Sequence, residues 1–187
     1  MGADMFLATA VILCKEMLKS YVSPIPGLND DQQIDKECGF TSANPDYEML
    51  MPVIFNLKHG TELYLKALIM QTDPQLEYPA SHDLLFLLNT LISNLCSRGV
   101  DTAMINALDK DAKAIIEKYY YGLYAFATDK TMPDINNEAE RYPEYRNPQC
   151  YQIKDLHMVV SVDLLTPIKA DGVALQHIFR EAIYRRI

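Results

Sequence analysis

Apolar residues recur at helical spacing in five segments of the chain, and charged or polar residues occupy the positions between them. Within residues 4–22, apolar side chains return every three to four positions while two lysines and a glutamate lie on the other side. The same period runs through residues 45–71, 82–97 and 101–126, and from residue 166 onward. A repeat of about 3.6 residues is typical of amphipathic α-helices, so the pattern predicts five helices.

Residues with capping side chains set the predicted ends of these helices. Asn44 is placed to cap the second helix, and Pro45 follows at a position where a missing N–H does no harm. The remaining expected boundaries are a Ser81 cap for the third helix with Gly99 after its end, an Asp101 cap for the fourth, and a Thr166 cap for the last with Pro167 as its first residue.

Two long segments lack the helical period and are rich in residues that form turns. Residues 23–44 contain "SPIPG", "NDD" and "CGFTSANP", and residues 128–150 contain three prolines among polar side chains, so both are predicted to be surface loops. The stretch "YQIKDLHMVVSVDL", residues 151–164, is β-branched enough for a short strand but has no partner strand. We expect this stretch to be extended.

These elements predict an all-α fold. Short links between the second, third and fourth helices indicate antiparallel neighbours, as in an up-down bundle. A chain of 187 residues fits one domain of about five helices with two long loops, spanning residues 1–187.

Composition narrows the classes of function. A formal net charge of −8 opposes long-range attraction to phosphate backbones, although it leaves room for a local basic site. No apolar run is long enough to cross a bilayer, and the N-terminus lacks the basic region of a signal peptide, so we expect a cytoplasmic protein without membrane contact. The four scattered cysteines predict free thiols and no metal site, and no cofactor-binding motif is present.

A charged stripe runs along the second predicted helix, in "FNLKHGTELYLKALI". Lys58, Glu62 and Lys66 are spaced four apart, which allows a solvated ladder of ion pairs or, with His59 beside it, a functional site. Gly60 is unusual inside a helix and favours close approach of another helix or a ligand. The residues alone leave both interpretations open.

Two further polar groups are candidate sites. "SHDLL" places His82 beside Asp83 at the start of the third helix, either as a functional pair or as a neutral imidazole within local hydrogen bonds. "RYPEYRNP" gathers arginines that can hold phosphate and tyrosines that can stack on bases, or forms a lid packed on the bundle. Its candidate ligand-binding residues are Arg141, Tyr142 and Arg146.

The run "LKHGTELYLKALI" followed by "SHDLLFLL" resembles the paired signature of the HEPN superfamily, named for higher eukaryotes and prokaryotes nucleotide binding. Glu62 and Lys66, then His82, Asp83 and Leu84, match the positions of that signature. The clear match covers residues 57–88, and "RYP" and "VDLL" resemble the C-terminal part of some prokaryotic members. The resemblance implies a helical bundle that forms homodimers, and its active members are metal-independent ribonucleases of defence and toxin systems, which act beside a cognate antitoxin-like protein.

One hallmark of those ribonucleases is missing. They carry an arginine followed after four to six residues by a histidine, whereas here the nearest such pair, Arg146 and His157, has ten residues between. We therefore expect a HEPN-like module that binds a nucleotide, RNA or a partner protein without standard catalysis. The expected binding residues are His59, Glu62, Lys66, His82, Asp83, Arg141, Tyr142 and Arg146.

Two alternatives remain open. The first is a divergent metal-independent endoribonuclease, in which His82 or His59 moves protons while Arg141 or Arg146 steadies the phosphate. The second is a purely structural interaction bundle.

Overall fold

The all-α prediction is confirmed. The computed structural model describes residues 2–22, 45–75, 78–120 and 162–184, and these residues form helices and short links without a strand. No helix in these ranges is long and apolar enough to span a membrane. The elements are α1 (Gly2–Val22), α3 (Pro45–Thr72), α4 (Leu84–Ser97), α5 (Thr102–Asn106), the π-helix η1 (Ala107–Ala112), α6 (Lys113–Tyr120) and α7 (Val162–Tyr184).

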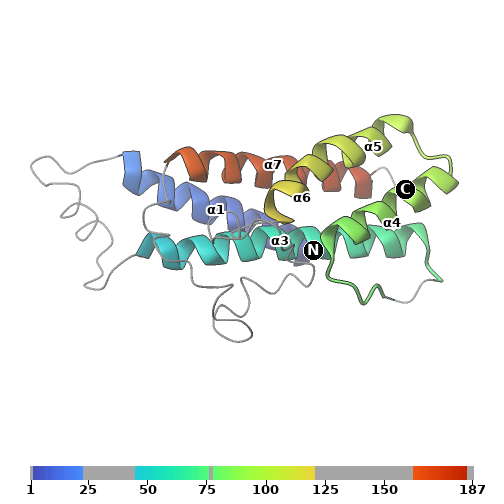
Figure 1. Cartoon of the computed structure of the whole chain (residues 1–187), viewed down its shortest axis with the longest axis horizontal. Coiled ribbons are helices and arrows are strands. Elements are labelled where there is room, and N and C mark those ends of the chain that lie inside the picture. Colours follow the sequence, from blue (N-terminus) through green and yellow to red (C-terminus); the bar gives the residue numbers. More distant parts are fainter. Residues whose placement is uncertain (1, 23–44, 76–77, 121–161, 185–187) are drawn as a thin grey trace, which may run out of the picture.

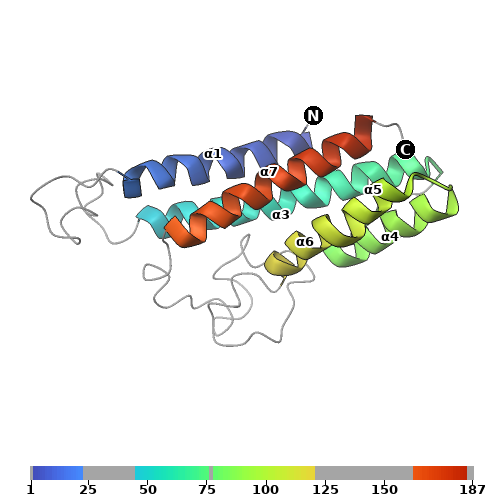
Figure 2. The same cartoon turned by 90° about the horizontal axis from the view of Figure 1, so that it is seen from above.

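Three long helices, α1, α3 and α7, lie alongside one another, and α4 with α5–η1–α6 covers the C-terminal half of α3 (Figures 1 and 2). α1 runs antiparallel to both α3 and α7. Counting α5, η1 and α6 as one continuous helix, the described residues form the five helices that the pattern predicts.

The direction of α4 differs from the prediction. His82 contacts Glu62, while Asn94 Nδ2 donates to Thr72 Oγ1 at 3.2 Å, so the two helices advance in the same direction. The expected antiparallel pairing of the second and third helices is therefore wrong. The link between Thr72 and Leu84 permits the parallel arrangement because an extended residue spans about 3.3 Å, whereas a helical residue rises about 1.5 Å.

The start of α4 also differs from the prediction. Asp83 is the N-cap, because its Oδ1 accepts from the backbone N–H of Phe86 at 2.9 Å. The Ser81 hydroxyl instead accepts from the N–H of Asp83 at 3.1 Å, before the helix begins. At the other end, Gly99 follows the helix with φ of 68°, as expected for a residue after a C-cap.

The last helix begins earlier than predicted, at Val162, so Thr166 is not its cap and residues 162–164 are helical rather than extended. Pro167 lies inside the helix. A proline near the N-terminus is tolerated there because its fixed φ suits the helix and only one backbone hydrogen bond, to the carbonyl of Asp163, is lost. Residues 151–161 and both predicted loops lie outside the described residues.

The predicted fourth helix contains a π-helical stretch. Asp101 caps it as expected, since its Oδ1 accepts from the N–H of Ala103 at 3.0 Å. Within it, the buried positions Met104, Leu108, Ala112 and Ile116 are spaced four apart. The wider turn of η1 keeps these residues on one face over a longer stretch than an α-helix would. Residues 121–126, the predicted end of this helix, are outside the described part of the chain.

Two glycines let α1 approach the other long helices closely. A Cβ added to Gly60 on α3 would lie 3.0 Å from the backbone nitrogen of Leu7. One added to Gly172 on α7 would lie 2.9 Å from Cγ2 of Val11. Of the two partners that Gly60 could accommodate, a helix or a ligand, the structure places a helix there.

A polar cluster on Asp4 ties the same three helices together. Asp4 Oδ1 accepts from the Tyr64 hydroxyl at 2.6 Å and Gln176 Nε2 at 2.9 Å, and Arg180 donates to both carboxylate oxygens. The hydrogen bonds from Arg180, aided by those from Tyr64 and Gln176, hold the pKa of Asp4 well below its ordinary value. Burial and the neighbouring Asp4 carboxylate raise the pKa of Tyr64.

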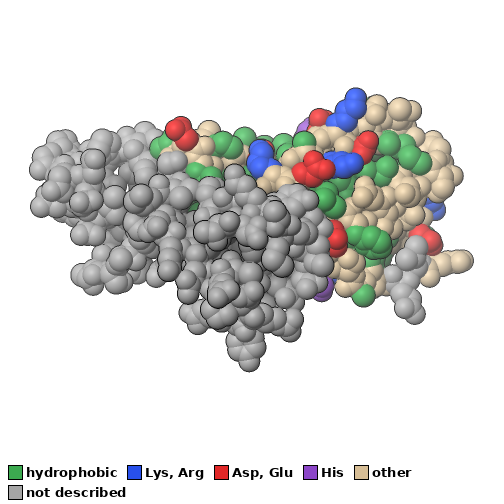
Figure 3. Space-filling view, in the orientation of Figure 1, with side chains coloured by type: hydrophobic (Ala, Val, Ile, Leu, Met, Phe, Trp, Pro, Cys, Tyr) green, Lys and Arg blue, Asp and Glu red, His purple; other side chains and the backbone are tan. Residues whose placement is uncertain are grey.

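A second cluster ties α6 to α7. Asp171 Oδ2 accepts from Lys118 Nζ and from the Tyr119 hydroxyl, each at 2.6 Å. Acidic and basic side chains mix on the face where these helices meet (Figure 3). Burial, together with the hydrogen bond to Asp171, raises the pKa of Tyr119.

Candidate functional site

The charged stripe of α3 is buried. Lys58, Glu62 and Lys66 are each 2% exposed. The interpretation of the stripe as a solvated ladder is therefore wrong. The i,i+4 ion pair does form, with Lys66 Nζ 2.9 Å from Glu62 Oε1. An unpaired buried charge is very unfavourable, so the two charges of this pair must compensate each other in the interior.

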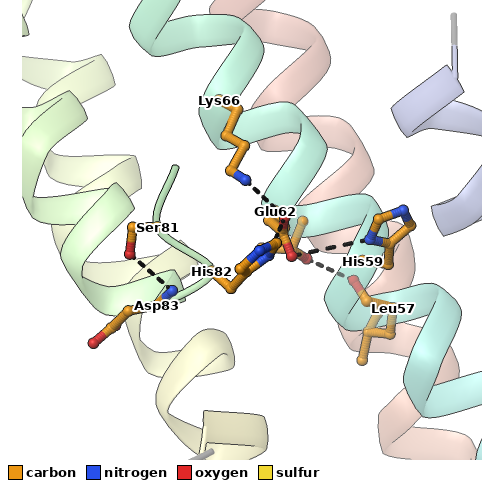
Figure 4. Close-up of polar contacts among 8 residues, drawn as sticks. Leu57, His59, Glu62, Lys66, Ser81, His82 and Asp83 are labelled. Atoms are coloured by element: carbon orange, nitrogen blue, oxygen red, sulfur yellow. Dashed lines mark hydrogen bonds and ion pairs between the residues drawn. The ribbon is translucent and has the colours of Figure 1, made fainter. Parts of the chain in front are cut away.

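Glu62 is the centre of the site (Figure 4). Its Oε1 contacts both Lys66 Nζ and His82 Nδ1 at 2.9 Å, and its Oε2 lies 3.9 Å from His59 Nδ1. Glu62, Lys66 and His59 share α3, whereas His82 comes from the segment before α4. The structure therefore brings together four of the predicted binding residues, from two separate sequence motifs.

The segment that carries His82 lies against α3. Because α4 runs parallel to α3, the chain must pass back along α3 before α4 begins. The hydrogen bond between Ser81 and the N–H of Asp83 shapes the turn on which His82 sits. The Asp83 side chain points away from Glu62 and caps α4 (Figure 4). Of the neighbouring pair in "SHDLL", His82 thus lies at the cluster and Asp83 at the helix start.

Aromatic rings flank the cluster on two sides. The His59 ring stacks on Phe55 at a centroid distance of 5.3 Å and meets the edge of Phe6 at 4.7 Å. Lys66 Nζ lies 5.0 Å from the ring centroid of Tyr78, a cation–π contact. Tyr78 was missed by the sequence analysis, although its place four residues before His82, in a proline-containing link, is a usable signal.

Part of the cluster reaches the surface. The side chain of His82 is 43% exposed and that of His59 is 22% exposed, while Tyr78 is 56% exposed. Glu62 and Lys66 lie behind them in the interior. A ligand at this surface would therefore meet imidazole and phenol groups whose positions are set by a buried ion pair.

Among the described residues, the cluster contains no arginine and no cysteine. Arg141, Tyr142 and Arg146 lie outside the described residues. Of the cysteines, Cys14 is buried and Cys96 exposed, both as free thiols, and burial raises the pKa of Cys14 to about 11. Within the described ranges, no group of three or more His, Cys, Asp or Glu side chains is placed to hold a metal ion.

Comparison of the chain with protein-family models, with curated proteins and with solved structures found no match. The interpretation of the site therefore depends on its own geometry.

Proposed function

We propose that the chain is a HEPN-like helical module that binds a ribonucleotide, free or as part of RNA, at the cluster of His59, Glu62, Lys66 and His82. The observation that carries the proposal is the 2.9 Å contact between His82 Nδ1 and Glu62 Oε1. This contact joins the two sequence motifs on which the resemblance rests, through residues 20 positions apart.

The chemistry of the cluster suits such a ligand. Imidazole and phenol side chains can hydrogen-bond to sugar hydroxyls and phosphate oxygens, and aromatic faces accept bases. The buried Glu62–Lys66 pair fixes these groups in advance, so that little ordering is required when a ligand binds. A purely structural bundle would not need two partly exposed histidines on one buried carboxylate.

The net charge favours a small ligand. A chain with a formal charge of −8 repels a long phosphate backbone, and affinity that depends on many phosphate contacts falls steeply with salt. We therefore propose a single nucleotide unit as the recognised element, and binding that depends only weakly on salt concentration.

Melting temperature tests this proposal. Adenosine 5′-monophosphate at about 100 times its Kd should raise the melting temperature by roughly 5–10 °C, because binding at that ratio adds about 2.7 kcal/mol of stability. His82→Ala should lower this rise, to about half if the lost hydrogen bond weakens binding tenfold. The matched control is His177→Ala, which removes an exposed histidine on α7 and should leave the rise unchanged.

The contradicting outcomes are specific. If neither adenosine 5′-monophosphate nor a short single-stranded RNA raises the melting temperature, the purely structural bundle is the better account. An equal rise in wild type and His82→Ala would place nucleotide binding elsewhere on the chain.

A further inference from the structure

The hydrogen-bonding partners of His82 determine which of its nitrogens can face a ligand. While Glu62 is ionised opposite Lys66, its oxygens only accept hydrogen bonds, so Nδ1 of His82 carries the proton that it shares with Glu62 Oε1. Lys66 Nζ, which can only donate, approaches the same oxygen. In the neutral imidazole, Nε2 is then an acceptor with its lone pair directed away from Glu62.

Tyr78 supplies an aromatic surface at the same buried ion pair. One face of its ring lies toward Lys66 Nζ, and the residue is 56% exposed. Tyr78 and His82 are four residues apart on one segment, and each contacts one member of the Glu62–Lys66 pair. The buried pair thus fixes both side chains relative to each other.

An aromatic face and a neighbouring acceptor nitrogen select a particular ligand chemistry. Any nucleobase can stack on a tyrosine ring, whereas an acceptor nitrogen requires a donor such as a hydroxyl. The ribose 2′-hydroxyl is the donor that distinguishes RNA from DNA. The combination therefore fits a base stacked on Tyr78 with its ribose turned toward His82.

We infer that Tyr78 and His82 form the ligand-facing surface of a ribonucleotide site, in which the Tyr78 ring stacks on the base and His82 Nε2 accepts a hydrogen bond from the ribose 2′-hydroxyl. Glu62 and Lys66 are positioning residues that do not touch the ligand. This inference rests on the proposed function and adds to it the sugar preference and the stacking residue.

Binding measurements on four ligands test the inference. They are a short single-stranded RNA, the DNA of the same sequence, adenosine 5′-monophosphate and its 2′-deoxy analogue. The wild-type protein should bind the ribose form of each pair about twofold to tenfold more tightly, the range expected for one net hydrogen bond. A preference seen only with the oligonucleotides identifies RNA as the source of the ribonucleotide, and one seen with the monophosphates identifies the free nucleotide.

Tyr78 should determine the affinity for both sugar forms, and His82 should determine the preference for ribose. Tyr78→Ala should weaken binding of both sugar forms at least fivefold while keeping their ratio, because stacking does not depend on the sugar. Tyr78→Phe should bind like wild type, since the ring is retained. His82→Ala should bring the ratio to about one. Tyr184→Ala, which removes an exposed tyrosine on α7, is the control and should change neither quantity.

The outcomes separate this inference from the proposed function. No binding of any of the four ligands overturns both. Ribonucleotide binding that keeps its sugar preference in His82→Ala, or its affinity in Tyr78→Ala, overturns this inference and leaves a nucleotide-binding module. Because Tyr78 is mostly exposed, its variants should keep the melting temperature of the wild type, so that a loss of binding reports the contact itself.

Discussion

Glu62→Ala is expected to lower the free energy of unfolding by about 3–5 kcal/mol, because it leaves Lys66 as an uncompensated charge in the interior. Lys66 is only 2% exposed, so water cannot replace the lost carboxylate without a rearrangement of the segment that covers it. His82 loses the same partner. Denaturant unfolding, followed by circular dichroism, measures the change.

A second ion pair of the chain provides the matched control. Glu16 and Lys19 on α1 are 2.7 Å apart and exposed, so Glu16→Ala should cost at most about 1 kcal/mol. Replacing both members of the buried pair, Glu62→Met with Lys66→Met, should recover most of the loss because no unpaired charge remains. Equal effects of Glu62→Ala and Glu16→Ala would mean that the pair is not buried in solution.

Asp4→Ala is expected to cost about 2–3 kcal/mol, somewhat less than Glu62→Ala. The carboxylate of Asp4 accepts from Arg180 and from the buried Tyr64, and hydrogen bonds to charged groups are worth about 1.5–3 kcal/mol. Asp4 is a third exposed, so water can take over part of its role. The cost should appear in denaturant unfolding at neutral pH.

The same residue should make stability depend on pH in the acid range. The pKa of Asp4 lies well below its ordinary value of 3.8 in the folded chain, so its contribution is present above about pH 4. It is lost as the pH falls toward the folded pKa, because the unfolded chain then binds the proton first. Wild type should therefore lose more stability than Asp4→Asn between about pH 5 and pH 2. Identical acid dependence of the two proteins would contradict the assignment.

Helix positions were predictable because they depend on local periodicity, whereas helix directions were not. The link between α3 and α4 is short enough to suggest a hairpin, yet its residues can also extend back along α3. The choice is made by contacts such as His82 with Glu62, which join residues distant in sequence. No local pattern contains that information.

Helix starts were ambiguous where two capping groups lie close together. In "SHDLL", Ser81 and Asp83 can each accept a hydrogen bond from a helix N–H, and the sequence does not rank them. Thr166 followed by Pro167 has the composition of a start, but a proline near an N-terminus also fits inside a helix. In both cases the sequence signal allows a helix start without requiring one.

The grouping of His59, Glu62, Lys66 and His82 was predicted, but the burial of Glu62 and Lys66 was not. His59, Glu62, Lys66 and His82 were expected to act together, and they do lie around one carboxylate. A charged stripe on a helix normally faces water, so its burial could be seen only once the segment carrying Tyr78 and His82 was placed over it. Tyr78 was not predicted as a site residue for the same reason.

Nitrogen NMR of the histidine rings tests the central claim, that a buried carboxylate orients His82 toward a ribonucleotide, most directly. In protein labelled with ¹⁵N-histidine, His82 should carry its proton on Nδ1, and addition of adenosine 5′-monophosphate should shift its Nε2 signal. The signals of His177 should stay in place. A His82 ring protonated on Nε2 alone, or one whose signals ignore the nucleotide, would contradict the account.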